Sequence, residues 1–405
     1  PDVVVVDVRE PDDYAAGHIP GAVSLSPAGL ALVDTPDAAG LAAELGRRGL
    51  SGRGRIVCYG DSTRDGRAAL LFWALDAAGA EGPMVLEGGI EAWTEESRPV
   101  DRSPNRLPAV VWTGPPACDR VASAAYVAWR FGEDGFELVD ARGWDAWHGR
   151  LDEDHWGSVS RDGHIPHALP YDFSDFFRGG MLRAPDETRT IFSRFGPRPS
   201  SPVDLGDEFI VYGRDAEEGA VGYFLLRRAG IEALRLFPGG WVAWKDDPSL
   251  PVVRIVTPEE MYERVMRSRR WLRPDAPPEE FALLDVRHWG DHASGHIPGA
   301  VSLTSTFFAD SLDVYLERHW PALDRTDAPI VTYCYGSNCI RSRETSTEAA
   351  RAGFVHVERF YEGVDGWRLA DGELLSDEER LEIMRQEYEK LRGKAEREEG
   401  GSNGR

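Results

Sequence analysis

The sequence GHIPGAVSL at residues 295–303 decides how this chain is organised, because the same nine residues stand at 17–25. Asp-Val-Arg precedes both copies, at 285–287 and at 7–9, and the interval between the two motifs is the same in each place. Chance does not account for two matched pairs of motifs at opposite ends of a chain. We therefore infer that one structural unit is repeated along the sequence.

A third copy lies between these two. It has Asp-Ala-Arg at 140–142 and GHIP at 163–166, separated by a longer stretch rich in Gly and Asp that we expect to be a surface loop. Each copy closes on a motif in which glycine is followed by tryptophan: GGIEAW at 88–93, GGWVAW at 239–244 and GVDGW at 363–367. Three copies also suit the length of the chain, since domains usually have about 100–200 residues.

Between the opening and closing motifs, each copy has a short β-rich run and then a run of helical character that ends in Ala-Gly. Glycine at such an end suits a helix C-terminus. Alternating strands and helices predict a mostly parallel sheet that helices cover on both faces. The paired runs are 55–59 with 68–79, 209–212 with 221–230, and 329–333 with 345–353.

Asp-x-Arg, Gly-His-Ile-Pro and the closing Gly-x-x-x-Trp together resemble the rhodanese (sulfurtransferase) family, over nearly the whole chain. The resemblance implies an α/β fold of three tandem rhodanese-like domains, each with a mostly parallel central sheet flanked by helices. We place the domains at 1–101, 108–252 and 256–375. A charged helical or disordered tail is predicted at 376–405.

Composition excludes several classes of function. The formal net charge of -23 argues against a nucleic-acid partner, since Lys and Arg hold phosphate backbones. No apolar run approaches the ~20 residues that a membrane helix needs. The four cysteines are too few for a disulfide scaffold and lack the Cys/His grouping of a metal site. We therefore expect a cytoplasmic protein without a membrane or metal partner. The start directly in an expected strand is compatible with a removed upstream leader.

The resemblance implies a nucleophilic cysteine where the central strand ends and a loop leads to a helix. Backbone N–H groups and the helix dipole stabilise a thiolate there and can hold an anion. Counting back from the glycine that ends each helical run aligns Tyr59 with Tyr333, so Cys334 matches Gly60. The middle copy has Gly213 in this place. We predict that Cys334 is the catalytic residue, that the third domain is catalytic and that the first two domains are inactive.

The loop after Cys334 is predicted to bind the substrate, chiefly through backbone N–H groups. Arg341 is the cation that we favour for binding thiosulfate or a carboxylate, and Arg343 either shares this role or faces solvent. The loop is longer than the common sulfurtransferase loop, so the resemblance does not identify the sulfur donor. The predicted binding residues are Tyr335, Gly336, Ser337, Asn338, Cys339, Ile340, Arg341 and Ser342.

The other cysteines allow several interpretations. Cys339 has three possible roles. It could resolve an oxidised or persulfidated Cys334 by forming a disulfide with it, it could be the nucleophile itself, or it could be a small residue that fills the underside of the loop. Cys58 and Arg64 have the Cys-x5-Arg spacing of phosphatases and arsenate reductases in the same superfamily. The alternative for Cys58 is a small buried hydrophobe in a strand. Cys118 stands in a Pro-rich linker and is expected to be incidental.

The recurring histidines and arginines are predicted to be structural, because they also stand in the two copies that lack the loop cysteine. We expect the histidines to hydrogen-bond the backbone and fix the Ile-Pro turn. The arginines are expected to pair with carboxylates and tie loops together. These residues are His18, His164, His296, Arg9, Arg142 and Arg287.

The resemblance implies a sulfurtransferase with double-displacement chemistry. The Cys334 thiolate takes sulfur from a small donor (thiosulfate, mercaptopyruvate or a persulfide), and the resulting persulfide passes it to cyanide, a thiol or a protein cysteine. This chemistry needs no metal and no organic cofactor. Two alternatives are a thiol-redox enzyme or oxyanion reductase that uses Cys334 with Cys339, and a non-catalytic protein-binding platform. A phosphatase that depends on Cys58 and Arg64 is a weaker one.

Overall fold

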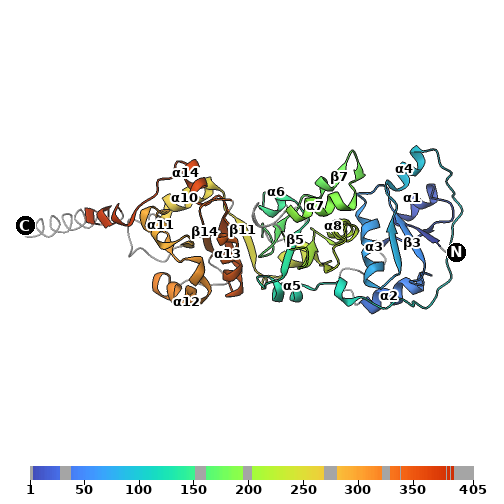
Figure 1. Ribbon diagram of the computed structural model, residues 1–405, viewed down its shortest axis with the longest axis horizontal. Helices are drawn as coiled ribbons and strands as arrows, with labels where there is room; N and C mark the ends of the chain where they lie inside the picture. The colour runs from blue at the N-terminus through green and yellow to red at the C-terminus, as the bar shows by residue number, and fades with distance from the viewer. Residues whose placement is uncertain are drawn as a thin grey trace, which may run out of the picture. The chain divides into compact units, whose positions relative to one another are not determined.

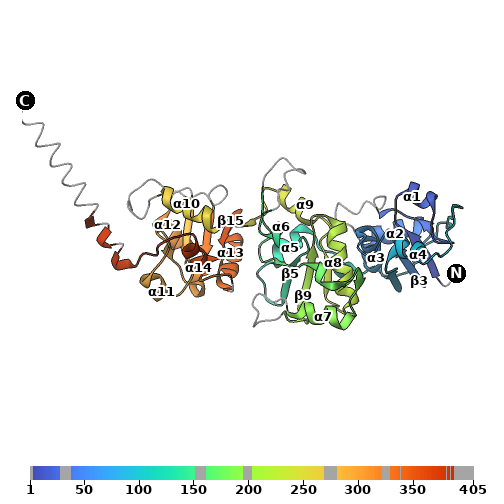
Figure 2. The same ribbon diagram turned by 90° about the horizontal axis from the view of Figure 1, so that it is seen from above.

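The computed structural model has three parallel β-sheets with helices packed around each (Figures 1 and 2). Contacts divide the chain into two compact units, Pro1–Leu250 and Pro251–Arg405. Among the residues described, no helix has both the length and the apolar character needed to cross a membrane. The structure describes residues 3–27, 38–150, 161–194, 203–268, 281–321, 329–337, 339–379, 381–383 and 385–386.

The first sheet has four parallel strands in the order β2-β1-β3-β4. Parallel neighbours require long connections, and helices supply them. The strands are β1 (Val3–Asp7), β2 (Val23–Ser24), β3 (Arg55–Tyr59) and β4 (Gly82–Val85). The helices are α1 (Pro11–Ala16), α2 (Ala38–Arg47), α3 (Gly66–Ala77) and α4 (Gly89–Glu95).

The second sheet repeats this topology in the order β10-β9-β5-β6, again parallel, and a short antiparallel hairpin accompanies it. The sheet strands are β5 (Phe136–Asp140), β6 (Leu169–Pro170), β9 (Glu208–Tyr212) and β10 (Leu234–Leu236), and the hairpin is β7 (Phe177–Arg178) with β8 (Met181–Leu182). The helices are α5 (Ala124–Arg130), α6 (Trp144–Trp147), α7 (Pro185–Arg194), α8 (Ala216–Arg228) and α9 (Gly240–Asp246), with 3-10 turns η2 (Cys118–Arg120) and η3 (Phe173–Phe176).

The third sheet has five parallel strands in the order β11-β15-β14-β12-β13. The strands are β11 (Val252–Ile255), β12 (Ala282–Asp285), β13 (Val301–Ser302), β14 (Ile330–Tyr333) and β15 (His356–Phe360). The helices are α10 (Pro258–Ser268), α11 (Trp289–Ser294), α12 (Phe308–His319), α13 (Arg341–Arg351) and α14 (Gly363–Leu369), with the 3-10 turn η5 (Ser305–Phe307).

The predicted α/β class with three mostly parallel sheets is therefore confirmed. The domain limits drawn from the sequence remain predictions. Strand β11 begins at Val252, the last residue of the predicted second domain, and ends at Ile255, just before the predicted third domain. Within the predicted tail, residues 377–379, 381–383 and 385–386 are helical, and its remaining residues after 379 lie outside the described chain. Most of the predicted surface loop of the middle copy, residues 151–160, lies outside it as well.

The Asp-x-Arg motif forms the same buried network in every sheet. In the third, Arg287 donates to both carboxylate oxygens of Asp285 and, at 2.7 Å, to the carbonyl oxygen of Gly295. The Tyr333 hydroxyl donates to Asp285 at 3.0 Å and accepts the N–H of Ile297 at 3.2 Å. The corresponding sets are Arg9, Asp7, Gly17, Tyr59 and Ile19, and Arg142, Asp140, Gly163, Tyr212 and Ile165.

The histidine of each GHIP motif is bonded to the backbone, as predicted. Its Nδ1 lies 2.9 Å from a carbonyl oxygen, and its ring stacks on the side chain of the residue that owns this oxygen. The pairs are His18 with Tyr14, His164 with Trp147, and His296 with His292. These contacts fix the turn that carries the Ile-Pro peptide.

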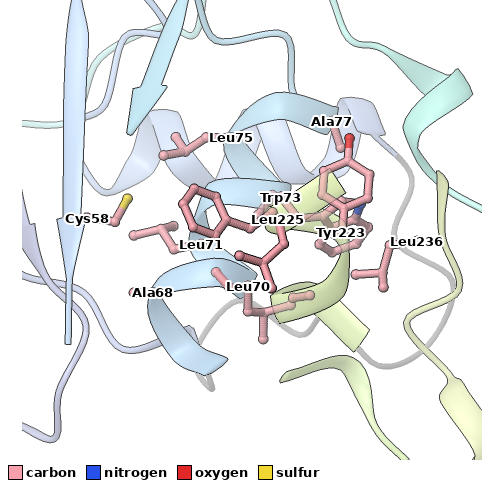
Figure 3. Close-up of a cluster of buried hydrophobic side chains, with 14 of the residues drawn as sticks. Cys58, Ala68, Leu70, Leu71, Trp73, Leu75, Ala77, Tyr223, Leu225 and Leu236 are labelled. Atoms are coloured by element: carbon pink, nitrogen blue, oxygen red, sulfur yellow. The ribbon is translucent and has the colours of Figure 1, made fainter. Parts of the chain in front are cut away.

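The first two domains share one hydrophobic cluster, built largely where α3 meets α8 (Figure 3). Leu71 and Trp73 of α3 and Tyr223 of α8 are fully buried in it. The Tyr223 hydroxyl donates to Asp76 at 2.6 Å, so the one polar atom of this ring is satisfied. The joint core explains why these two domains form a single compact unit.

We expect Trp73→Ala to lower the free energy of unfolding of the first unit by about 3–5 kcal/mol, because a cavity replaces a fully buried indole. Calorimetry of the whole chain should show the transition of the first unit at a lower temperature. Trp367→Ala, in the core of the third domain, is the matched control and should shift only the other transition. If either variant moved both transitions equally, the division into two units would be wrong.

Candidate active site

Cys334 directly follows β14, the central strand of its sheet, and its side chain is buried. A loop then leads to α13, which begins at Arg341. The carbonyl oxygens of Cys334 and Tyr335 accept the N–H groups of Val364 and Asp365, so the start of α14 holds the start of the loop. The thiol position thus lies between the carboxyl edge of the sheet and a helix N-terminus, which favours an anion.

The same backbone contact identifies the equivalent positions in the other domains. The carbonyl oxygen of Gly60 accepts the N–H of Ile90, and that of Gly213 accepts the N–H of Trp241. Each of these glycines follows the tyrosine that bonds the buried carboxylate, as Cys334 does. The alignment by tyrosine is therefore confirmed, and glycine occupies the place of the cysteine in the first two domains.

The loop of the first domain is filled by its own carboxylate. Asp65 accepts the N–H of Asp61 at 2.9 Å and the N–H of Arg67 at 3.0 Å. A Cβ placed on Gly60 would lie 2.0 Å from Asp65 Oδ2. The carboxylate thus takes N–H groups that an anionic substrate would need, and it occupies the space of a nucleophilic side chain.

The second domain closes its loop by shortening it. Its helix α8 begins at Ala216, three positions after Gly213, whereas α13 begins seven positions after Cys334. A Cβ on Gly213 would lie 2.4 Å from the N atom of Gly219. Asp215 and Glu218 accept loop and helix N–H groups here as well. Neither of the first two domains has room for a thiol at this position.

Cys58 is a buried hydrophobe of β3, as one of its two interpretations held. Its side chain is fully buried in the joint core, and burial raises the pKa of its thiol far above the ordinary value. The guanidinium of Arg64 lies 4.6 Å from the centre of the Phe177 ring, and Arg64 is exposed. The phosphatase alternative is therefore not supported, because its two residues do not form an anion-binding loop. Cys118 is exposed and free.

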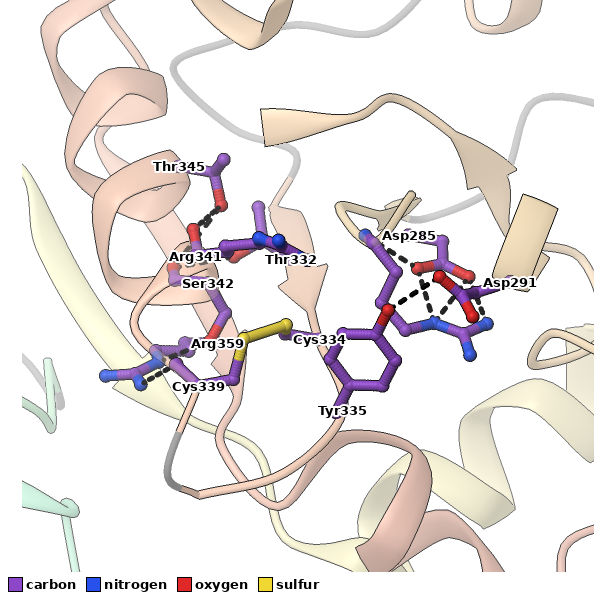
Figure 4. The surroundings of a disulfide bond; sticks show 11 residues. Asp285, Asp291, Thr332, Cys334, Tyr335, Cys339, Arg341, Ser342, Thr345 and Arg359 are labelled. Carbon is purple, nitrogen blue, oxygen red and sulfur yellow. Dashed lines mark hydrogen bonds and ion pairs between the residues drawn. A yellow bond between two sulfur atoms is a disulfide. The ribbon is translucent and has the colours of Figure 1, made fainter. Parts of the chain in front are cut away.

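Cys334 and Cys339 are joined by a disulfide, with their Cα atoms 6.3 Å apart (Figure 4). Cys334 is only 1% exposed, whereas Cys339 is half-buried, so solvent reaches Cys339 more readily. The N–H of Cys339 donates to the carbonyl oxygen of Gly336 at 2.9 Å, which turns the chain back over Cys334. This pairing favours a resolving cysteine over a passive filler of the loop.

Arginines surround the loop. Arg341 is half-buried, and its guanidinium lies 6.0 Å from the centre of the Tyr335 ring. Arg343 is buried, so the alternative that it faces solvent is wrong. The Tyr335 hydroxyl donates to Asp291 at 2.6 Å (Figure 4), and burial together with this bond raises the pKa of Tyr335. A neutral phenol therefore ties the exposed side of the loop to α11.

Sequence reasoning missed a further cation, Arg359 of β15. Its Nε donates to Ser342 Oγ at 2.9 Å, and its Nη2 donates to the carbonyl oxygen of Cys339 at 3.5 Å (Figure 4). The side chain is buried, and burial lowers the pKa of Arg359 to about 10. Arg359 therefore remains a cation at neutral pH, directly beneath the second cysteine.

The position of Arg359 is apolar in the other domains. Strand pairing places Val85 and Leu236 at the equivalent positions of the first two sheets. A signal was present in the sequence, since the charged residues Glu358 and Arg359 stand between Val357 and Phe360 in a strand where a parallel sheet normally carries apolar side chains. Only the structure shows that Arg359 contacts the loop of Cys334, through Ser342 and Cys339.

The buried carboxylate network of the third domain has one additional member. Nδ1 of His292 lies 3.0 Å from Asp285 Oδ2, where the other domains have Tyr14 and Trp147. Burial acts to raise the pKa of Asp285, but the bonds from His292 and the neighbouring arginine outweigh it and hold the pKa below its ordinary value. Burial and the Asp285 charge raise the pKa of Tyr333, so its hydroxyl stays a donor.

His292, His296 and Asp377 form the one group of potential metal ligands found among the described residues. Their geometry does not suit an ion. The two imidazoles stack with centroids 3.8 Å apart and planes 8° from parallel, so their in-plane lone pairs cannot converge. The Nδ1 atoms are occupied by Asp285 and by the His292 carbonyl oxygen. We assign no metal to this cluster.

The structure gathers most of the predicted binding residues in one turn beside Cys334. Gly336 is buried there, and a Cβ on it would lie 2.6 Å from the Asp365 carboxylate. Asn338 lies outside the described residues. The residues brought together are Tyr335, Gly336, Ser337, Cys339, Ile340, Arg341 and Ser342. Their roles in binding remain predictions.

The family model of the rhodanese-like domain matches residues 1–96, 123–247 and 269–370. The putative thiosulfate sulfurtransferase SseB of Mycobacterium tuberculosis is 32% identical over 279 residues, which cover 62% of this chain and 91% of that protein. The thiosulfate sulfurtransferase of Azotobacter vinelandii is 27% identical over 269 residues, with the same two shares. The probable 3-mercaptopyruvate sulfurtransferase of Pseudomonas aeruginosa is 28% identical over 272 residues, 62% of this chain and 92% of that protein.

Among solved structures, the anaerobic ergothioneine biosynthesis enzyme from Chlorobium limicola superposes with a TM-score of 0.54. The match has 20% sequence identity and covers 63% of this chain and 65% of that chain. At this identity the likeness concerns the fold alone.

The plugged loop of the first domain can be tested by a double-mutant cycle. Gly60→Ala should lower the free energy of unfolding of the first unit by about 1–3 kcal/mol, because its Cβ meets the Asp65 carboxylate. The loss should be clearly smaller in the Asp65→Ala background. Gly82→Ala, whose Cβ would meet nothing closer than 3.4 Å, is the control. Equal losses in both backgrounds would show that Asp65 does not fill this space.

Proposed function

The chain belongs to the rhodanese-like family, and from this premise we propose that it is a sulfurtransferase whose nucleophile is Cys334. One observation carries the proposal. The residue that follows the tyrosine at the end of the central strand is a cysteine in the third domain and a glycine in the other two. In the first two domains an Asp or Glu carboxylate accepts N–H groups of the following loop, and among the described residues no carboxylate does so in the third. The first two domains then serve as a frame or as a docking surface.

The chemistry follows from the position of the thiol. The N-terminus of α13 and the N–H groups of the loop stabilise a Cys334 thiolate. This thiolate attacks the outer sulfur of the donor, the bond from that sulfur to the rest of the donor breaks, and a Cys334 persulfide forms. The same N–H groups hold the anionic persulfide until an acceptor takes the sulfur.

The donor is proposed to be a small anion. The curated relatives are named thiosulfate and 3-mercaptopyruvate sulfurtransferases, and both donors are anionic. A chain of net charge -23 repels such molecules at a distance, so local cations must attract them. Arg341 at the mouth of the loop is our candidate, supported by Arg343 behind it. A cytoplasmic location and a protein cysteine as one acceptor complete the proposal.

The disulfide favours one second candidate, a thiol-redox enzyme or oxyanion reductase that cycles Cys334 and Cys339. Such an enzyme would consume a dithiol and reduce an oxidant without any sulfur donor. It would therefore show no donor cleavage in the experiment below.

The test is cleavage of the donor in a single turnover. Reduced protein is mixed with thiosulfate or mercaptopyruvate, and the first turnover is followed as sulfite or pyruvate released per chain. We expect a burst of one equivalent with at least one donor, and a rate at least about a thousandfold lower for Cys334→Ser. Cys58→Ser and Cys118→Ser are the matched controls and should keep the burst. A burst that survives in Cys334→Ser, or no burst with either donor, would overturn the proposal.

A further inference from the structure

We infer that the third domain is also a hydrosulfide-releasing enzyme, in which Cys339 attacks the persulfidated Cys334 and the Cys334–Cys339 disulfide of the structure is the product. This inference rests on the proposed function, because it needs the persulfide. It adds a second fate for the sulfur. In place of transfer to an external acceptor, the sulfur leaves as hydrosulfide.

The step balances without an external oxidant. The Cys339 thiolate forms a bond to Cys334 Sγ, and the bond from Cys334 Sγ to the outer sulfur breaks. The outer sulfur leaves with the electron pair of that bond and is protonated to hydrosulfide by the proton that Cys339 gave up. The leaving sulfur is the oxidant: it takes two electrons and becomes hydrosulfide, and the two cysteine sulfurs lose these two electrons and become a disulfide. An external dithiol then returns the disulfide to two thiols.

The folded loop already holds the attacking sulfur in place. The turn closed by the Cys339 N–H and the Gly336 carbonyl oxygen brings Cys339 back onto Cys334, within bonding reach. Figure 4 shows Cys339 on one side of Cys334 and the Tyr335 ring on the other. The reaction therefore needs no large rearrangement of the loop, which makes the intramolecular attack fast relative to attack by a dilute thiol.

The positive charge of Arg359 stabilises a thiolate at Cys339. Within the described part of the chain it forms no ion pair with a carboxylate, although it is buried, and the charges of Arg343, Glu362 and Tyr361 act on it only at longer range. A buried cation without a carboxylate is costly unless an anion arrives near it. A Cys339 thiolate, or the hydrosulfide that departs, is such an anion. The matched positions, Val85 and Leu236, belong to domains without a loop cysteine, so charge and second cysteine occur together.

The different exposure of the two sulfurs predicts how the cycle is completed. Cys339 is half-buried and Cys334 is buried, so a dithiol attacks Cys339. Cys334 is then the leaving group and emerges as the thiolate that the next donor requires. The more exposed cysteine thus serves both the release of sulfur and the recovery of the nucleophile.

The experiment follows the fate of one sulfur atom without any acceptor. Reduced, desalted protein is given one equivalent of the donor that produces the burst, without oxygen, and hydrosulfide and intact mass are measured together. We expect wild type to release one hydrosulfide per persulfide formed and to end lighter than the reduced chain by two hydrogen atoms. Cys339→Ser should instead gain the mass of one sulfur, release no hydrosulfide and yield thiocyanate when cyanide is added.

Each other outcome overturns a defined statement. A stable persulfide on wild type, or equal hydrosulfide release from Cys339→Ser, overturns the inference and leaves the proposed function standing. No donor burst and no gain of sulfur in either protein overturns the proposed function itself, and the inference with it. Cys339→Ala repeats the measurement if the serine variant does not fold, and Cys118→Ser, at the exposed free cysteine outside the site, is the control for the loss of a thiol.

Arg359 acts as a positioning residue for Cys339 and has its own readout. Arg359→Leu, which introduces the residue of the second domain, should slow hydrosulfide release about tenfold at neutral pH, because the Cys339 thiolate then has to form without a neighbouring cation. The pH profile of release should move upward by about one unit accordingly. Arg359→Lys should restore most of the rate. A pH profile identical to that of wild type in Arg359→Leu would contradict this role.

Discussion

In each domain one buried carboxylate holds together three segments that lie far apart in the chain. In the third domain, Asp285 at the end of β12 accepts hydrogen bonds from Arg287 and from Tyr333 at the end of β14, and Arg287 in turn holds Gly295 of the GHIP turn. A buried charge of this kind is stable only while all its partners stay in place. The end of the central strand is therefore fixed right up to the next residue, which is Cys334 in the third domain.

Because this frame is the same three times, the loop after the tyrosine starts from the same place in each domain, and the domains differ in how that loop is filled. Helix N-termini and loop N–H groups attract an anion in all three. Asp65 supplies that anion from within the first domain, and Asp215 with Glu218 supplies it in the second. In the third domain the place next to the strand belongs to Cys334. The loops of the first two domains thus hold an internal carboxylate where the loop of the third domain holds Cys334.

The sequence was sufficient for the parts that repeat. The motifs predicted three parallel sheets, and counting from the helix-ending glycines aligned Cys334 with Gly60 correctly, because the interval from the tyrosine to that glycine is the same in these two copies. Residues without a counterpart were out of reach. The sequence of β15 alone does not show that Arg359 lies under Cys339, because the two residues are twenty positions apart and are brought together by the folding of the sheet and the loop. The joint core of α3 and α8 was missed for the same reason.

The helix after the loop has a buried face that is apolar in the first two domains and polar in the third. Counted from the closing glycine, Trp73 of α3 and Phe224 of α8, which bury apolar rings in the joint core, correspond to Thr347 of α13. Buried Ser and Thr side chains of α13 donate to carbonyl oxygens of their own helix, as Thr347 does to Arg343 at 2.9 Å. Such a face contributes little hydrophobic stabilisation, but one of its hydroxyl oxygens, Ser342 Oγ, accepts a hydrogen bond from the buried Arg359 and so lowers the cost of burying that charge. The apolar helices α3 and α8 of the first two domains are suited to packing against each other, whereas α13 is suited to burying charge behind the loop of Cys334.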